Sequence, residues 1–203
     1  MKRPYAVTMT GERQHARGSV TRPLLRFSNV ALNRGGRLLF EGLDLELGPG
    51  DGLHVAGPNG SGKSSLIRLA AGLLPATRGE VQREAATLAD DSLALDRELP
   101  LARALAFWGG ETALAMEALA IAHLADVPVR LLSSGQQKRA TLARVAASGA
   151  SLWLLDEPLN ALDAEGGERL ARLVQRHREA GGAVVAASHQ PLAGTWRRLE
   201  LGE

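Results

Sequence analysis

Apolar and polar residues alternate in two stretches of the chain, LLRFSNVAL (24–32) and FEGLDLELG (40–48). Alternation with a period of two predicts half-buried β-strands, and RGG at 34–36 predicts the turn between them. Shorter strands are predicted at GEVQ (79–82) and AATLA (85–89). Runs of apolar residues, typical of strands buried on both faces of a sheet, lie within GLHVAG (52–57), LWLLDEP (152–158) and AVVAASH (183–189).

Other segments have the apolar spacing of helices. The run SLIRLAAGLL (65–74) is followed by Pro75, and SGQQKRATLARVAAS (134–148) and EGGERLARLVQRHREAGG (165–182) follow later. Residues 92–130 are rich in Ala and Leu and also show helical periods. Because strands and helices alternate, we expect an α/β fold whose parallel sheet has right-handed crossovers. A small α-helical subdomain over about 92–147 is predicted as an insertion.

Residues 1–22 show no sustained period and are rich in Arg, Thr and Gly. This composition predicts a disordered basic arm, or a start codon upstream of the true start. Binding to acidic lipid head groups is the alternative for this segment.

The composition excludes several kinds of protein. Lys and Arg number 24 against 22 Asp and Glu, so bulk charge gives no reason to expect a nucleic-acid partner. The sequence has no cysteine, which rules out a disulfide, a thiolate zinc site and a thiol nucleophile. No apolar run approaches the roughly 18 residues of a membrane span. We therefore expect a cytosolic chain that reaches a membrane only through a partner.

The segment after the strand at 52–57 carries a phosphate-binding motif. GPNGSGKS (57–64) fits G-x-x-x-x-G-K-[ST] between a strand and a helix, the context that the motif requires. Glycines let backbone N–H groups wrap phosphate oxygens, Lys63 adds a positive charge, and the Ser64 hydroxyl suits Mg²⁺. We assign nucleotide binding to Gly57, Pro58, Asn59, Gly60, Ser61, Gly62, Lys63, Ser64 and Ser65.

Two carboxylates end the apolar strand at 152–155. Asp156 lies where ligands sit in open α/β sheets and is predicted to bind Mg²⁺. Glu157 points elsewhere and is predicted to be the general base that polarises water. In isolation such a pair can also be a helix N-cap cluster. The phosphate loop upstream favours the metal site.

His189 follows the strand at 183–187, which we take as the final parallel strand. A lone His after a strand is more often structural, but this position favours contact with a γ-phosphate. Structural or surface positions are predicted for His15, His54, His123 and His177.

A second helix start, LLSSGQQKRA (131–140), also has the features of an anion site. Its LSSGQ (132–136) resembles the signature motif of ATP-binding cassette (ABC) proteins, and LNALD (159–163) resembles their D-loop. The resemblance covers residues 24–203 and implies a P-loop NTPase cassette domain over 23–203 that uses ATP and Mg²⁺. It also implies a head-to-tail homodimer, in which Ser133, Ser134, Gly135 and Gln136 cap the ATP held by the other chain.

A narrower resemblance rests on DVPVRLLSSGQQKR (126–139), LWLLDEPLNALD (152–163) and SHQPL (188–192). These stretches resemble the heme-exporter ATP-binding subunits of cytochrome c maturation. That resemblance implies a translocase-type ATPase at the cytoplasmic face of the bacterial inner membrane. Its partners would be a separate transmembrane permease subunit and heme-handling membrane proteins, and ATP use would drive heme export or release of a heme chaperone.

Two positions depart from the cassette pattern. Arg34 stands where cassettes usually carry an aromatic residue that stacks on adenine, and a guanidinium plane can stack too. The glutamine that usually precedes the helical insertion is missing, and Asp91 or Ser92 takes its place.

Three alternative functions stay open at this point. One is a cassette for another small substrate, such as a lipid, peptide or metal chelate. Another is a soluble regulatory cassette in DNA repair or translation, although those usually carry a long coiled-coil insertion or a second cassette. A simple P-loop kinase would not need LSSGQ.

Overall fold

The computed structural model describes residues 7–10 and 22–202 and places their strands in two sheets. A six-stranded sheet has the order β1-β9-β4-β8-β7-β6, and a three-stranded sheet has the order β3-β2-β5. The strands of the larger sheet are β1 (Val7–Thr10), β4 (Gly52–Ala56), β6 (Ala86–Ala89), β7 (Leu152–Asp156), β8 (Ala183–Ala187) and β9 (Arg197–Leu201). All its pairings are parallel except that of β1 with β9.

The smaller sheet is antiparallel and contains β2 (Leu25–Arg34), β3 (Arg37–Leu47) and β5 (Arg78–Arg83). Strands β2 and β3 form a hairpin whose last paired residues are Arg34 and Arg37. The two turn residues, Gly35 and Gly36, have φ angles of 59° and 75°, a left-handed conformation that glycine adopts without strain.

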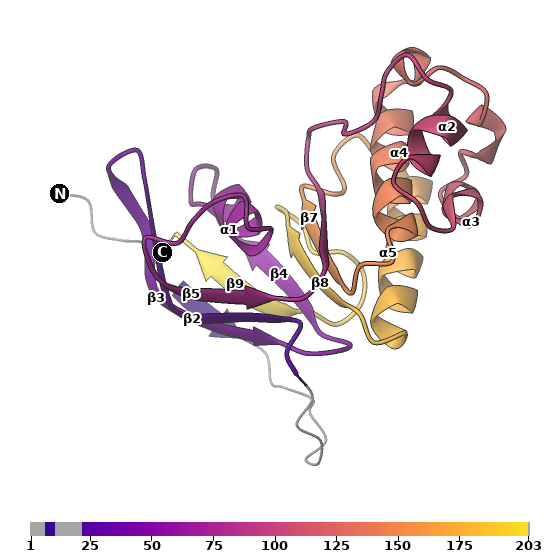
Figure 1. The fold of residues 1–203 in the computed structure, drawn as a ribbon. Coiled ribbons are helices and arrows are strands. Elements are labelled where there is room, and N and C mark those ends of the chain that lie inside the picture. The colour runs from indigo at the N-terminus through magenta and orange to yellow at the C-terminus, as the bar shows by residue number, and fades with distance from the viewer. Residues whose placement is uncertain (1–6, 11–21, 203) are drawn as a thin grey trace.

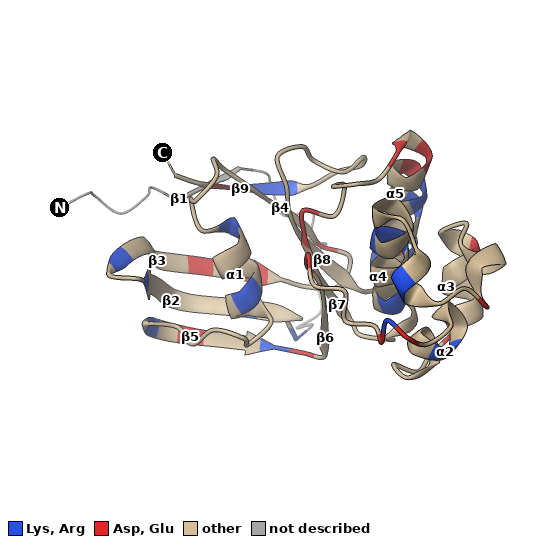
Figure 2. Cartoon of the chain, turned by 90° about the horizontal axis from the view of Figure 1, so that it is seen from above, with Lys and Arg blue, Asp and Glu red and all other residues tan. Residues whose placement is uncertain are grey.

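Helices cover both faces of the six-stranded sheet. Figure 1 shows α1 (Lys63–Ala70) between this sheet and the antiparallel one, while α4 (Ser134–Ala147) and α5 (Ala164–Glu179) lie on the opposite side. Two shorter helices, α2 (Leu101–Ala106) and α3 (Thr112–Ala118), pack beside α4, followed by 3₁₀ turns at Ala122–Leu124 and Val129–Leu131. Figure 2 shows Lys and Arg residues along α4 and α5, and also in α1, β9 and the antiparallel sheet.

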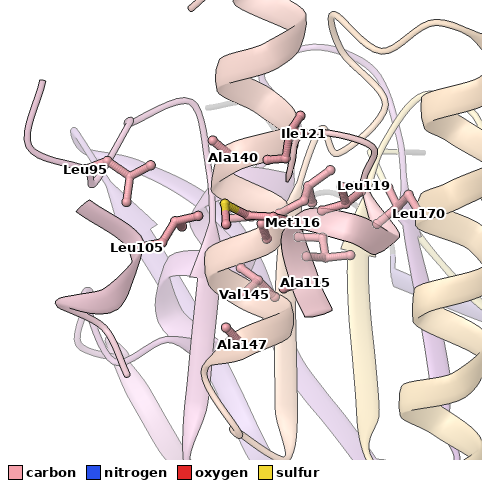
Figure 3. Packing of buried hydrophobic residues seen from close by; sticks show 14 of the residues in the cluster. Leu95, Leu105, Ala115, Met116, Leu119, Ile121, Ala140, Val145, Ala147 and Leu170 are labelled. Carbon is pink, nitrogen blue, oxygen red and sulfur yellow. The ribbon is translucent and has the colours of Figure 1, made fainter. Parts of the chain in front are cut away.

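The central strands separate two hydrophobic cores. Side chains alternate between faces along a strand, so Leu152 and Leu154 of β7 enter the core under α1 and the antiparallel sheet. Trp153 and Leu155 enter the core shared with the helical side. Figure 3 shows part of the second core, where residues of α3 and the loop after it pack against α4. These observations confirm the predicted α/β fold with antiparallel N-terminal strands and a helical insertion.

Two sequence predictions need correction. Residues 7–10 lie within the predicted disordered arm but form β1, because they complete the exposed edge of β9. Residues 1–6 and 11–21 of that arm, including His15, lie outside the described residues. Strand β8 is also not the final parallel strand, because β9 pairs in parallel with β4. His189 therefore lies in the segment that connects two parallel strands of the sheet, β8 and β9.

No helix in the described ranges is long and apolar enough to cross a membrane.

Candidate nucleotide-binding site

The phosphate loop joins the end of β4 to the start of α1, and its backbone requires glycine. Gly57 has a φ of 140°, and a Cβ there would lie 2.1 Å from the carbonyl oxygen of Leu201. Gly62, the N-cap of α1, has a φ of 108° and makes no side-chain cap. The first backbone N–H groups of α1 are therefore left without a side-chain acceptor, as an anion site at a helix start needs.

The lysine of the loop is held inside it. Lys63 is only 7 % exposed, and its Nζ donates to the carbonyl oxygens of Gly57 at 2.8 Å and Pro58 at 3.2 Å. The Ser61 hydroxyl is buried and has no hydrogen-bond partner among the described residues. A buried polar atom without a partner is costly, so an oxygen-rich anion bound in this loop would stabilise Ser61.

Asp156 ends β7 beside the helix start. Burial raises the pKa of Asp156, and interaction with the neighbouring Ser64 side chain opposes the rise. The carboxylate oxygen Oδ1 is buried without a partner among the described residues. An unpaired carboxylate oxygen next to a hydroxyl suits Mg²⁺, which prefers oxygen ligands. No group of three or more His, Asp or Glu in the described ranges could hold a metal by itself.

Glu157 follows Asp156 with a left-handed backbone. Its φ is 45°, which is rare for a residue with a Cβ and is fixed here by a 2.8 Å hydrogen bond from its N–H to the Ala187 carbonyl. The carboxylate oxygen Oε1 of Glu157 lies 3.7 Å from Nε2 of His189. The structure thus brings the predicted base and the predicted γ-phosphate contact together at the ends of β7 and β8.

The other described histidines occupy structural or surface positions. His54 is buried in β4, and its Nε2 lies 2.9 Å from the Ser188 carbonyl oxygen. His177 stacks on Trp153 with 4.0 Å between ring centroids. His123 lies in a 3₁₀ turn of the helical side.

The predicted signature segment forms the start of α4. Ser133 is the N-cap: its Oγ accepts from the backbone N–H of Gln136 at 3.3 Å, and Oε1 of Gln136 accepts from the backbone N–H of Ser133 at 2.8 Å. This reciprocal arrangement is a capping box. No hydrogen bond or ion pair among the described residues joins residues 133–136 to the phosphate loop. Ser134 is exposed at the first helical position.

One site residue was missed by the sequence analysis. Lys138 lies one helical turn after Ser134, is 8 % exposed, and its Nζ is 3.5 Å from the carbonyl oxygen of Asp156. Burial lowers the pKa of Lys138, whereas the charges of Asp91, Asp156, Asp90 and Glu157 act in the opposite direction. The available signal was the four-residue spacing, which places Lys138 on the same helix face as Ser134.

The two candidates for the missing glutamine differ in surroundings. Both the backbone N–H and the hydroxyl of Ser92 donate to Oδ1 of Asp90, at 3.0 and 2.7 Å. Asp91 is exposed, and its charge influences the pKa of both Lys138 and Asp156. Of the two, Asp91 is therefore the residue coupled electrostatically to the site.

Known proteins are similar to this chain in sequence and in fold. A family model described as ABC transporter matches residues 40–160. The cytochrome c biogenesis ATP-binding export protein CcmA of Sphingopyxis alaskensis is 53 % identical over 84 % of this chain and 92 % of its own length. The protein of the same name from Novosphingobium aromaticivorans is 55 % identical, over 82 % of this chain and 88 % of its own length.

Solved structures match the fold at lower identity. A dimeric ATP-binding cassette in a post-hydrolysis state, bound to ADP and Pi, superposes with a TM-score of 0.71 at 24 % identity, over 82 % of this chain and 88 % of that one. A nucleotide-free cassette from an ABC transporter superposes with a TM-score of 0.69 at 20 % identity, over 83 % of this chain and 82 % of that one. The chain belongs to the ABC transporter family, within the group of cytochrome c biogenesis ATP-binding export proteins.

Proposed function

We propose that the chain binds Mg-ATP and hydrolyses it as the ATPase subunit of a membrane ABC transporter. The observation that carries this proposal is that two groups of residues, one suited to Mg²⁺ and one to water activation, lie at adjacent strand ends. The buried, unpartnered Oδ1 of Asp156 lies beside Ser64 at the end of a complete phosphate loop. Glu157 and His189 lie 3.7 Å apart next to it.

The chain's own residues can divide the reaction among them. On nucleotide binding, the Lys63 ammonium would exchange its two loop carbonyls for phosphate oxygens, and Ser64 and Asp156 would hold Mg²⁺. The ion, when bound, neutralises charge on the phosphate oxygens. Glu157 accepts a proton from the water that attacks the γ-phosphorus, while the bond from that phosphorus to the β–γ bridging oxygen breaks and ADP leaves. His189 donates a hydrogen bond to a γ-phosphate oxygen.

A second copy of the chain completes the site. Because Ser134 is exposed and residues 133–136 make no hydrogen bond to their own phosphate loop, Ser134 at the start of α4 is available to another molecule. We expect it to cap the γ-phosphate held by Lys63 of a second chain in a head-to-tail dimer. Helix starts stabilise anions through their unpaired N–H groups and dipole.

The helical side offers a docking surface for a transmembrane permease. Phe107 is 81 % exposed, next to the partly exposed Trp108. Beside them lies a groove of about 380 Å³, lined mainly by apolar side chains that include Leu93, Leu95 and Leu99. An apolar patch next to a groove is typical of a protein interaction site. The chain would then sit peripherally at the cytoplasmic face of the inner membrane.

The relatives' name directs the proposal towards cytochrome c biogenesis. We infer that ATP hydrolysis here, as a translocase-type reaction, drives heme export or release of a heme chaperone by membrane proteins that handle heme. The substrate would be recognised by those partners.

Replacement of Glu157 by Gln tests the ATPase proposal. Turnover should fall by about a hundredfold or more, because the general base is lost. The dissociation constant of ATP should stay within about threefold, because the phosphate loop is intact. The variant should also form an ATP-dependent dimer on gel filtration. Lys63→Ala is the matched control and should lose ATP binding. Turnover of Glu157→Gln near the wild-type rate would show that Glu157 is not the base.

A further inference from the structure

No aromatic ring in the described ranges is placed to stack on a nucleotide base. Phe27 and Phe40 are buried in the core between the sheets. Trp153 is buried against His177, and Trp196 lies next to Arg178. The two remaining described aromatic residues, Phe107 and Trp108, belong to the helical side. Among the described residues, the base would therefore be held by groups other than an aromatic ring.

The side chain of Arg34 contacts the start of α1, which suits a role other than base stacking. Arg34 ends β2 at the hairpin tip, and its Nη1 donates to the hydroxyl oxygen of Ser65 at 3.1 Å. Within residues 22–202 this guanidinium makes no ion pair. Its charge is thus available to an anion, and its direction is set by the serine that it contacts.

Ser65 belongs to the phosphate-binding end of α1. The first hydrogen bond of the α-helical type in this helix runs from the N–H of Leu66 to the Gly62 carbonyl, at 2.8 Å. The N–H groups of Lys63, Ser64 and Ser65 precede it and have no such acceptor. The hydrogen bond from Arg34 to Ser65 therefore places a guanidinium at the helix start that attracts phosphate.

We propose that Arg34 binds the phosphate chain, so that the site selects a triphosphate and discriminates little between bases. The inference rests on the proposed function and deepens it: GTP and UTP should be substrates as well as ATP. A guanidinium fork matches the oxygens of a phosphate and can bind two of them at once. With its orientation fixed by the Ser65 hydroxyl, Arg34 faces the phosphate side of the site.

Binding of three nucleotides and of inorganic tripolyphosphate to the full chain tests this. In the Glu157→Gln background, titration calorimetry with Mg²⁺ avoids turnover. We expect dissociation constants for ATP, GTP and UTP within about threefold of one another, a spread of less than about 0.7 kcal/mol. Tripolyphosphate should compete with all three. ATP binding that is tenfold or more tighter than UTP binding would overturn the proposal.

Substitution of Arg34 separates phosphate binding from base stacking. Arg34→Gln should weaken the binding of ATP, UTP and tripolyphosphate by a similar factor of about ten, because one charge-assisted contact is lost. Arg37→Gln, a matched removal of one positive charge on the facing strand, should change binding by less than about twofold. If Arg34 stacks on the base instead, Arg34→Gln weakens ATP but leaves tripolyphosphate unchanged, and the proposal fails.

Arg34→Tyr gives the converse measurement. A ring at the hairpin tip should restore preference for purines, so that ATP binds at least about fivefold tighter than UTP. Lys63→Ala distinguishes this inference from the proposed function. Lys63-dependent binding with strong selectivity for adenine would overturn the inference alone. No binding of any triphosphate would overturn both.

Discussion

The chain has two helix starts suited to anions, and they are built in opposite ways. At α1 the N-cap is Gly62, no side chain caps the helix, and the ammonium of Lys63 rests on loop carbonyls. At α4 the N-cap is Ser133, and the capping box with Gln136 satisfies two backbone N–H groups. The first start is open and charged, whereas the second is largely closed by its own side chains.

This difference indicates different tasks for the two starts. An open start with a buried lysine is ready to take a highly charged ligand from solution. A capped start is stable in the separate chain. It offers an anion only the exposed Ser134 and the dipole of α4. It can therefore bind the phosphate of a nucleotide that is held by another chain. The contrast leads to four predictions, ordered from the largest expected effect to the smallest.

The largest effect comes from mixing two inactive variants. Lys63→Ala removes the charge of the open start, and Ser134→Arg fills the capped start with a bulky cation. Each homodimer should be nearly inactive. Mixing equal amounts should restore up to about a quarter of wild-type ATPase activity, because half of the dimers are then heterodimers that keep one intact composite site. Steady-state ATPase assays after mixing measure this.

A linked heterodimer provides the control for the mixing experiment. One chain carries both substitutions and the other carries neither, so both composite sites are damaged. Activity should stay low in this arrangement. Equal activity in the mixed and the linked arrangements would refute the head-to-tail pairing of the two starts.

The second prediction compares one glycine from each start. Gly57→Ala should lower the free energy of unfolding by about 3 kcal/mol or more, because φ is left-handed and the Leu201 carbonyl blocks a Cβ. Gly135→Ala should change it by less than about 1 kcal/mol, since a helix favours Ala over Gly while the Ala161 carbonyl oxygen lies 3.0 Å from the new Cβ.

Urea unfolding without nucleotide measures both changes. Gly60→Ala is the matched loop control, because its φ is 79° but no atom lies within 4 Å of the added Cβ. It should cost only about 1 kcal/mol. Equal losses at Gly57 and Gly60 would mean that the close approach of β9 does not constrain the loop.

The sequence was a good guide where local pattern decides structure. The apolar run at 152–155 predicted a buried strand, and G-x-x-x-x-G-K-S predicted a turn between strand and helix. Strand β9 was missed because RRLEL has three charged residues among five, and its order comes from pairing with β4 on one side and β1 on the other. Such tertiary pairing leaves no local signal.

The site was predictable to the extent that motifs place residues at strand ends. Glu157 and His189 were expected near one γ-phosphate, and the structure places them 3.7 Å apart, while their roles stay predictions. Lys138 was missed because a lysine in a helix usually faces solvent. Only the packing of α4 against the end of β7 shows that it is buried beside Asp156.

The third prediction tests the closed start directly. Ser133→Ala removes one half of the capping box and should lower the free energy of unfolding by about 1 kcal/mol, or the midpoint temperature by about 2–4 °C. Ser134→Ala, whose hydroxyl takes no part in the box, is the control and should leave the midpoint unchanged. Calorimetric scans of both variants measure this. A Ser133→Ala midpoint equal to the control would show that the box contributes nothing to stability.

The smallest effect concerns an ion pair between α4, which carries the capped start, and the N-cap of α5. Arg139 of α4 donates to Oδ1 of Asp163 at 2.6 Å, and the same carboxylate oxygen accepts from the Gly166 N–H at 2.9 Å. Hydrogen bonds from Gly166 and from Arg139 lower the pKa of Asp163 below its ordinary value of 3.8. The folded state therefore binds this proton less tightly than the unfolded state does. The associated stability is present above pH 3.8 and is lost as pH falls through the lowered pKa.

Asp163→Asn keeps an N-cap for α5, because Asn caps as well as Asp, but it removes the charge that faces Arg139. The wild type should be slightly more stable than this variant at pH 7, and the difference should shrink as pH drops below 3.8. Urea midpoints at pH 7 and at successively lower pH measure the difference. Glu168→Gln is the matched control, because the pair of Glu168 with Arg172 is exposed and long at 3.8 Å. A difference between wild type and Asp163→Asn that persists unchanged into acid would mean that geometry, and not charge, ties the D-loop to the signature helix.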